Sequence, residues 1–192
     1  MWGLETGAMG VALEDDALLV REVLGGDVDT FGLLYDRYAG LIRAICHDEA
    51  PRDVHQAQDM CQEVFLRGYR NLVTLKDPEN FAGWLVGIAR LVCREWRRKR
   101  LRDRNRFVAD PPEQAADPAE AGSWEEADGI LAAIADLPER ERLALHLFYL
   151  QENPAEDARD VLKLSRSGFY RLLERAAANL KSRIGSDWES NR

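Results

Sequence analysis

The sequence predicts an all-α protein with two small helical domains joined by a flexible, acidic, proline-rich linker. Apolar residues recur at intervals of three and four along most of the chain, which is the period of an amphipathic helix, and no stretch alternates with the period of a strand. Residues 107–123 interrupt this pattern with three prolines, four acidic residues and no basic residue. Because such a segment buries too little apolar surface to stay ordered, we expect it to separate a domain at 14–106 from a domain at 124–184.

Four helices are expected in the first domain. Their predicted ranges are 14–25, 29–50, 53–71 and 78–101. The first ends at a glycine pair, the second ends before Pro51, and Pro78 suits the first turn of the fourth. In the fourth helix the expected buried stripe is Phe81, Trp84, Leu85, Ile88, Val92 and Trp96.

Four further helices are expected in the second domain. Their predicted ranges are 124–135, 137–150, 154–163 and 165–184. Ser165 is a good N-cap for the last of them, and the turn before it, at Leu164, is very short. Such a tightly joined pair has the length and polarity of a helix-turn-helix, whose second helix enters the major groove of DNA. Helix pairs of this kind also occur in bundles that bind no DNA.

Positive charge is concentrated in two blocks, although the chain has a formal net charge of −8. Residues 88–106 hold nine basic and two acidic side chains, and residues 161–184 hold six basic and one acidic. Phosphate binding depends on local charge density, so the pattern indicates two nucleic-acid contacts. Compensation of the helix dipole explains two or three of the cations in the first block but not all of them. Trp84 and Trp96 could stack on unpaired bases, but their place on the apolar stripe favours a role in the core.

Other classes of function are disfavoured by the composition. No run reaches the roughly 18–20 apolar residues that span a bilayer, and the first residues lack the pattern of a signal peptide, so we expect a cytoplasmic protein without membrane contact. Cys46, Cys61 and Cys93 lack the spacing of a metal site and are expected to be buried, reduced thiols without a bound metal or cofactor. Asp59 and Glu63 lie four residues apart on an exposed helix face, with no histidine near them, so we expect no catalysis.

The chain resembles the extracytoplasmic-function (ECF) group of bacterial RNA polymerase sigma factors, in the sigma-70 family. The order and spacing of the matching segments extend over 14–184, and the most specific piece is QEVFLR with the preceding Asp59. The matching segments are DALLVREVLGGDVDTFGLLYDRYAGLIRAIC, DMCQEVFLRGYRNL, FAGWLVGIARLVCREWRRKR and LPERERLALHLFYL, followed by the helix-turn-helix.

The resemblance implies a promoter-recognition subunit without chemistry or cofactor of its own. Its expected partners are core RNA polymerase, through the clamp helices of the largest subunit and the flap, promoter DNA, and an inhibitory anti-sigma factor. The implied face for core polymerase comprises Asp59, Gln62, Glu63, Leu66 and Arg70. The implied contacts to the melted minus-ten element are Lys76, Asn80, Arg90, Arg94, Arg97 and Arg98. Those to the minus-thirty-five duplex are Ser165, Arg166, Ser167, Tyr170, Arg171 and Arg175.

Three residues of the helix-turn-helix depart from the pattern of the family. Asp157 stands where an apolar residue is usual, and Lys163 stands where a glycine often makes the turn. In the recognition helix, Gly168 stands where small hydroxyl and basic residues are common. Two other hypotheses remain open. One is a helix-turn-helix regulator that does not replace a sigma subunit, and the other is a module that binds only protein partners.

Overall fold

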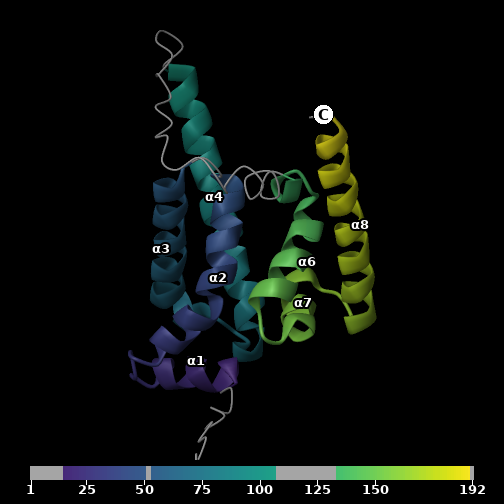
Figure 1. Ribbon diagram of the computed structural model, residues 1–192. Coiled ribbons are helices and arrows are strands. Elements are labelled where there is room, and N and C mark those ends of the chain that lie inside the picture. Colours follow the sequence, from purple (N-terminus) through teal and green to yellow (C-terminus); the bar gives the residue numbers. More distant parts are fainter. Residues whose placement is uncertain (1–14, 51–52, 107–132, 191–192) are drawn as a thin grey trace, which may run out of the picture.

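The computed structural model describes residues 15–50, 53–106 and 133–190, and these form helices with no strand among them (Figure 1). The all-α prediction is therefore confirmed for this part of the chain. The linker at 107–123 and most of the helix expected at 124–135 lie outside it. In the first half the helices are α1 (Asp16–Leu24), α2 (Phe31–Glu49), α3 (Val54–Asn71), η1 (Leu72–Thr74), η2 (Pro78–Asn80) and α4 (Phe81–Arg106). In the second half they are α6 (Glu139–Leu150), α7 (Pro154–Leu162) and α8 (Arg166–Ser190).

Local capping explains where several of these helices begin. The Asp15 carboxylate accepts a hydrogen bond from the backbone N–H of Ala17 at the start of α1, at 3.3 Å. Asp53 does the same for the backbone N–H of Gln56 at the start of α3, at 2.9 Å. Such a side chain satisfies one of the N–H groups that the first turn of a helix leaves unpaired. After α1 the chain turns at Gly26, whose φ of +108° is accessible to glycine at little cost.

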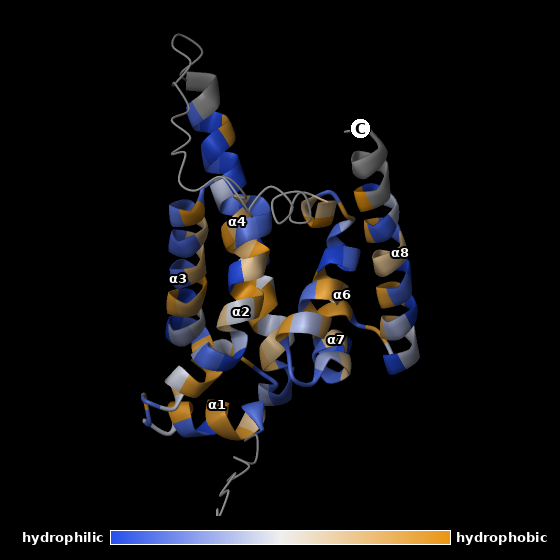
Figure 2. Ribbon diagram, viewed as in Figure 1, coloured by the Kyte–Doolittle hydropathy of each residue, from blue (hydrophilic) through white to orange (hydrophobic). Residues whose placement is uncertain are grey.

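Helices α2, α3 and α4 run side by side, and α1 lies across one end of them (Figure 1). The α4 helix is longer than expected, because it continues to Arg106 and projects beyond the end of α3. Its projecting part is mainly hydrophilic (Figure 2). The predicted stripe on α4 is confirmed for Phe81, Leu85 and Val92, which are buried. Trp84, Ile88 and Trp96 are only half-buried and pack against the edge of the core; this corrects the expected burial of the stripe.

One hydrophobic core extends through both halves of the molecule. It includes Leu34 and Phe81 from the first half together with Leu147, Val161 and Phe169 from the second. The contacts between the halves join α6 to α2 and α7 to α4. A smaller cluster, formed by Leu137, Leu145 and Ala176 with Leu173 and Leu180 beside them, lies between α6 and α8.

A buried carboxylate also holds α8 against α6. Glu141 is 4% exposed, and its two oxygens accept hydrogen bonds from Arg175 Nε at 2.9 Å and Asn179 Nδ2 at 2.8 Å. A buried carboxylate is tolerated when both oxygens have partners, so this contact fixes the position of α8 along α6. It lies within the second half and is independent of the contact between halves.

The three cysteines are free and buried, as predicted. Burial raises the pKa of the Cys61 thiol. Among the described residues, no group of three or more histidine, cysteine or acidic side chains is arranged to hold a metal ion. No described helix carries an apolar stretch of the length that crossing a bilayer requires.

Candidate nucleic-acid and polymerase interface

The outer face of α3 carries the residues expected to contact polymerase. Asp59, Gln62, Leu66 and Arg70 are all exposed, at spacings of three and four that bring them onto one side of the helix. Leu66 is a large apolar side chain that remains 42% exposed. The structure therefore brings these four together on an accessible face, with an apolar group among charged ones.

Glu63 belongs to the same helix but has partners within the chain. Its carboxylate lies 2.6 Å from Arg67 Nε, and Arg67 also lies 2.8 Å from the Glu95 carboxylate on α4. The hydrogen bonds that Arg67 donates to both carboxylates raise its pKa. Arg67 was not among the predicted residues. Its position predicts that it orients Glu63 and links α3 to α4.

Two tyrosines beside this face were missed by the sequence analysis. Tyr35 on α2 packs on Phe65, with 4.5 Å between ring centroids, and Tyr69 on α3 packs on Phe31 at 5.2 Å. Both tyrosines remain about 40% exposed. Each tyrosine comes one position after a residue of the apolar stripe of its helix. That spacing is typical of the rim of a core as well as of a contact surface.

The loop expected to contact melted DNA is anchored at both ends. Leu75 is 9% exposed, whereas the next residue, Lys76, points to solvent. Asp77 caps η2 by accepting a hydrogen bond from the backbone N–H of Glu79 at 3.2 Å. Asn80 is half-buried, and its Oδ1 accepts a hydrogen bond from Lys163 Nζ in the turn between α7 and α8, at 3.3 Å. One of the two predicted DNA contacts in this loop is therefore covered by the other half of the chain.

The arginine row on α4 is only partly free to contact a ligand. Arg94 and Arg98 are exposed as predicted. Arg90 is half-buried, and its Nε lies 2.7 Å from the Glu139 carboxylate of α6, so the expectation of a solvent-facing Arg90 is corrected. The N–H does not point at the carboxylate oxygen, so the contact is an ion pair without an aligned hydrogen bond.

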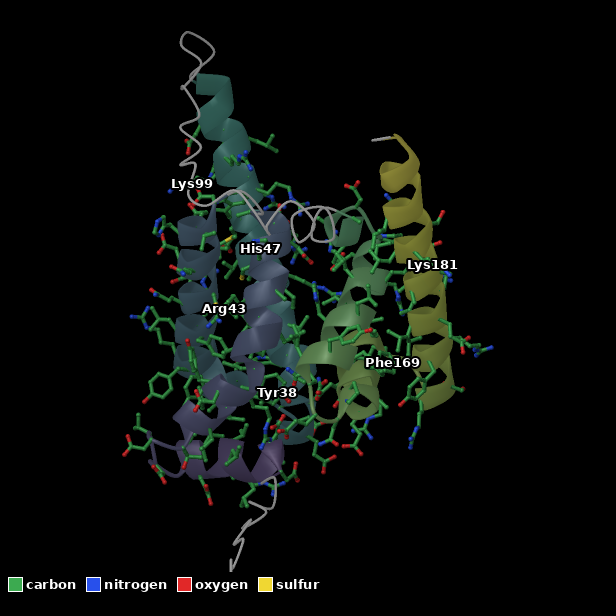
Figure 3. The ribbon with its side chains drawn as sticks, in the orientation of Figure 1. Tyr38, Arg43, His47, Lys99, Phe169 and Lys181 are labelled. Atoms are coloured by element: carbon green, nitrogen blue, oxygen red, sulfur yellow. The ribbon has the colours of Figure 1, made fainter. Side chains whose placement is uncertain are left out.

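Arg97 forms the second ion pair of this row. It donates two hydrogen bonds to the two oxygens of Glu49 on α2, one of them from Nε at 2.7 Å. These bonds raise the pKa of Arg97. Beyond it, Arg100 stacks over the Trp96 ring at 5.3 Å from the centroid, and Lys99 lies on the projecting part of α4 (Figure 3). Trp96 thus contacts the core on one side and a cation on the other.

The start of α8 carries an open polar face. Ser165 caps the helix by accepting a hydrogen bond from the backbone N–H of Gly168 at 3.3 Å, as predicted. Phe169 is fully buried, and its position on α8 facing α6 and α7 is seen in Figure 3. This anchor leaves the following predicted DNA contacts exposed: Ser165, Arg166, Ser167, Tyr170, Arg171 and Arg175. Arg175 differs from the others because it is bonded to the buried Glu141.

The turn before α8 has an unusual conformation. Lys163 has φ 54° and ψ 47°, which is the left-handed region, and it is the one residue other than glycine with positive φ among the described residues. A side chain in this region costs about 1 kcal/mol relative to glycine. A glycine is common at this position in the family that the sequence resembles, and the left-handed backbone conformation explains why.

The two halves also meet through Asp48, on the inner side of α2. Its carboxylate lies 2.9 Å from His146 Nε2 and 2.7 Å from Arg142 Nε, both on α6. Arg142 also donates hydrogen bonds to the backbone oxygens of Ala135, at 2.6 Å, and Leu137, at 3.2 Å. The contact therefore links α2 to both the start and the middle of the second half.

Comparisons with known proteins agree with this arrangement. Residues 34–103 match the family model for sigma-70 region 2. A probable RNA polymerase sigma factor, RfaY of Xanthomonas campestris pv. campestris, is 32% identical over 140 residues, which cover 69% of this chain and 35% of that protein. The chain therefore spans about a third of the length of that relative. The ECF RNA polymerase sigma factor SigW of Bacillus subtilis is 27% identical over 162 residues, covering 76% of this chain and 83% of SigW.

A solved structure shares the fold. CnrH, in its complex with the cytosolic domain of CnrY, superimposes with a TM-score of 0.60 at 20% identity, covering 91% of this chain and 99% of CnrH. The α2–α3–α4 bundle and its match to region 2 define a protein of the sigma-70 family. Within that family, the chain belongs to the ECF group of RNA polymerase sigma factors.

Proposed function

We propose that this protein is a sigma subunit that directs core RNA polymerase to promoters and starts transcription there. The observation that carries the proposal is the presence, on one chain, of an exposed mixed face on α3, an arginine-rich α4 and an exposed recognition face on α8. Each matches one task of a sigma subunit: binding polymerase, holding the melted minus-ten strand and reading the minus-thirty-five duplex. None of these tasks requires a catalytic group, and all take place in the bacterial cytoplasm.

The polymerase contact is assigned to Asp59, Gln62, Leu66 and Arg70, with Glu63 held in place by Arg67. An exposed leucine surrounded by charges suits a protein interface, where a buried apolar centre contributes affinity and polar groups at the rim contribute orientation. The two tyrosines at the rim of the core, Tyr35 and Tyr69, extend the same surface.

The DNA contacts are assigned to two places. On α4, Arg94 and Arg98 offer cations for the phosphates of an unpaired strand, and Lys76 with Asn80 extends that track at the other end of the domain. On α8, Arg166, Ser167, Tyr170 and Arg171 suit the groove of a duplex, because they lie in the first two turns of the second helix of the motif.

An inhibitory partner and a stress or envelope response follow from membership in the ECF group. The structural neighbour CnrH is itself solved with a protein partner, the cytosolic domain of CnrY. By analogy we propose an anti-sigma factor for this chain, and we propose that it competes with polymerase for the exposed face of α3.

Run-off transcription with purified core polymerase, on a library of genomic fragments, tests the proposal. We expect specific transcripts only when the protein is present, and failure to bind core polymerase would refute the assignment. The variant Arg94→Glu/Arg98→Glu should bind polymerase normally but open promoters at least about tenfold less, because a reversed charge repels the phosphates. The control is Arg21→Glu/Lys181→Glu, which makes the same change of net charge on exposed positions of α1 and α8 away from these contacts.

The same experiment separates the two alternatives. A regulator that does not replace a sigma subunit would bind duplex DNA tightly by itself, whereas the acidic surface of this chain opposes that. A module that binds only protein would tolerate the change at Arg94 and Arg98 without loss of function.

A further inference from the structure

The start of α4 and the end of α7 touch so closely that only a glycine fits between them. A Cβ added to Gly83 would lie 2.5 Å from the backbone oxygen of Asp160, which is far inside van der Waals contact. Gly87, one turn further along α4, has open space instead. Beside this contact, Lys163 reaches across to Asn80. The second half of the chain is therefore seated against the loop that we propose contacts melted DNA.

A part-buried polar cluster lies at the other edge of the same contact. Tyr38 of α2 is 1% exposed, and it lies near the end of α2 that faces α1 (Figure 3). Its hydroxyl contacts two carboxylates: it forms a short hydrogen bond with Asp16 of α1, and it lies 3.4 Å from Asp157 Oδ1 of α7. Asp16 also pairs with Arg37. Two segments from the first half and one from the second thus meet at a single phenol.

A phenol has one hydrogen and cannot donate to both carboxylates at once. The hydroxyl donates that hydrogen to Asp16, the nearer of the two carboxylates, whose negative charge Arg37 balances. The contact with Asp157 is then a hydrogen bond only if Asp157 carries a proton of its own and donates it to the phenol oxygen. An ionised Asp157 would instead face the lone pairs of the phenol and the negative Asp16.

The surroundings of Asp157 disfavour its charge. They form an open cavity of about 430 Å³. The charged or titratable groups that line it with Asp157 are Asp15 before α1, Asp16 of α1, Arg37 and Tyr38 of α2, Glu79 of η2, Glu152 before α7, and Glu156, Arg159 and Asp160 of α7. Of its two cations, Arg37 pairs with Asp16 and Arg159 with Asp160. Burial, and next the charge of Asp16, raise the pKa of Asp157 to about 7.

We propose that Asp16, Tyr38 and Asp157 form a proton-dependent latch, which holds the helix-turn-helix on the first half while Asp157 is neutral and releases it when Asp157 ionises. In the latched state Lys163 donates to Asn80 Oδ1, so the melted strand must displace Lys163 to bond to that oxygen. This consequence rests on the proposed function, whereas the latch itself does not. Two of the three departures from the family pattern are thereby explained, since Asp157 and Lys163 both contact the first half of the chain.

The direction of the pH effect follows from the pKa. The latched state favours the protonated form of Asp157, whereas an exposed carboxyl has its ordinary pKa near 3.8. Raising the pH therefore weakens the latch, and the loss is complete once the pH exceeds the pKa of about 7 in the latched state. Between pH 6 and pH 8 the equilibrium constant for opening should rise about tenfold.

Hydrogen exchange and small-angle scattering of the full-length free protein test the latch without polymerase or DNA. After correction for the intrinsic pH dependence of exchange, peptides covering 78–84 and 154–163 should exchange through an opening about ten times more populated at pH 8 than at pH 6. The radius of gyration should rise over the same interval. The variants Asp157→Asn and Asp157→Leu should both abolish this dependence and stay closed at pH 8.

Gly83→Ala provides the opposite change. It should leave the protein open at both pH values, whereas Gly87→Ala, which adds the same methyl group on the same helix, should behave as the wild type. The latch would be overturned if the population of the opening in the wild type were the same at pH 6 and pH 8. It would also be overturned if Asp157→Asn showed the same pH response as the wild type. Circular dichroism should show that each variant keeps its helices.

Run-off transcription keeps this result separate from the proposed function. If the latch responds to pH but no transcript appears with core polymerase, the sigma assignment fails and the latch stands. If transcripts appear but the free protein is equally open at both pH values, the latch fails alone. With both correct, Gly83→Ala should transcribe better than Gly87→Ala at pH 6, and the two should converge at pH 8.

Discussion

The two surfaces proposed to contact DNA differ in what the rest of the chain does to their charges. On α8, Arg166 and Arg171 point to solvent and form no ion pair with the other residues that the structure describes. On α4, Arg90 is paired with Glu139 and Arg97 with Glu49. The two basic blocks look alike in sequence, but Arg166 and Arg171 are available to phosphate at once, whereas Arg90 and Arg97 must first exchange partners, unlike the exposed Arg94 and Arg98 beside them. Charge density therefore locates a nucleic-acid surface, whereas ion pairing decides how readily it binds.

The largest effect is expected from removing the anchor of the open surface. Phe169→Ala should lower the free energy of unfolding by about 3–5 kcal/mol, because a fully buried ring is lost and a cavity remains. Minus-thirty-five binding should fall with it. Denaturant unfolding measures the first effect. The neighbouring Tyr170→Ala is the control and should cost less than about 1 kcal/mol, since that ring is 38% exposed. Equal costs at the two positions would contradict the anchoring role.

A comparison within α8 separates a DNA contact from a structural one. Arg171→Ala should weaken discrimination between promoter sequences by about 1–3 kcal/mol without affecting stability, because its side chain is exposed. Arg175→Ala should lower stability by about 1–2 kcal/mol and affect discrimination less, since Arg175 is bonded to the buried Glu141. Competition binding of holoenzyme to matched and mismatched promoters, beside thermal unfolding, measures both. If Arg175→Ala had the larger effect on discrimination, the distinction would be wrong.

The paired arginines of α4 can be released by removing their acidic partners. Glu49→Ala/Glu139→Ala should steepen the salt dependence of single-strand binding. The slope of log K against log salt should change by about 0.7 for each arginine released, and so by at most about 1.4 in total. Fluorescence anisotropy with a labelled oligonucleotide over a range of salt measures the slope. Glu22→Ala/Glu174→Ala, two exposed acids of α1 and α8, should raise affinity only slightly and leave the slope unchanged.

The smallest effect is expected at Gly168, in the first turn of α8. An added Cβ would lie 3.3 Å from the Ser165 hydroxyl oxygen and 3.6 Å from Leu164, so the cap must shift by a few tenths of an ångström. This cost offsets the gain of about 1 kcal/mol that alanine brings to a helix. Gly168→Ala should therefore change stability by less than about 0.5 kcal/mol, as measured by denaturant unfolding. A loss above about 2 kcal/mol would show that the glycine is required there.

Much of the fold could be predicted because it depends on local sequence. The period of apolar residues located α1 to α4 and α6 to α8, and the cap at Ser165 lies where the sequence indicated. The end of α4 was missed, since a charged sequence continues the helix without an apolar period to reveal it. The half-burial of Trp84 and Trp96 was missed for a related reason: a stripe of apolar residues shows direction but not depth.

The candidate site could be predicted less completely, because its chemistry depends on residues far apart in sequence. The face of α3 and the start of α8 are single helix surfaces, so their spacing sufficed. The partners of Arg90 and Arg97 come from α6 and α2, and no spacing in the sequence indicates them. Asp157 was recognised as unusual, but its partner Tyr38 is 119 residues away. Only the packing of the two halves explains it.

The buried thiols make the molecule convenient for site-specific labelling. Cys46, Cys61 and Cys93 lie within the core, and burial raises the pKa of Cys61. A maleimide reacts with an exposed, ionised thiol, so cysteines engineered on the surface should be modified long before the native three. Dyes on the outer faces of α3 and α8 could then follow the distance between the two halves in real time, without removing any natural cysteine and disturbing the packing around it.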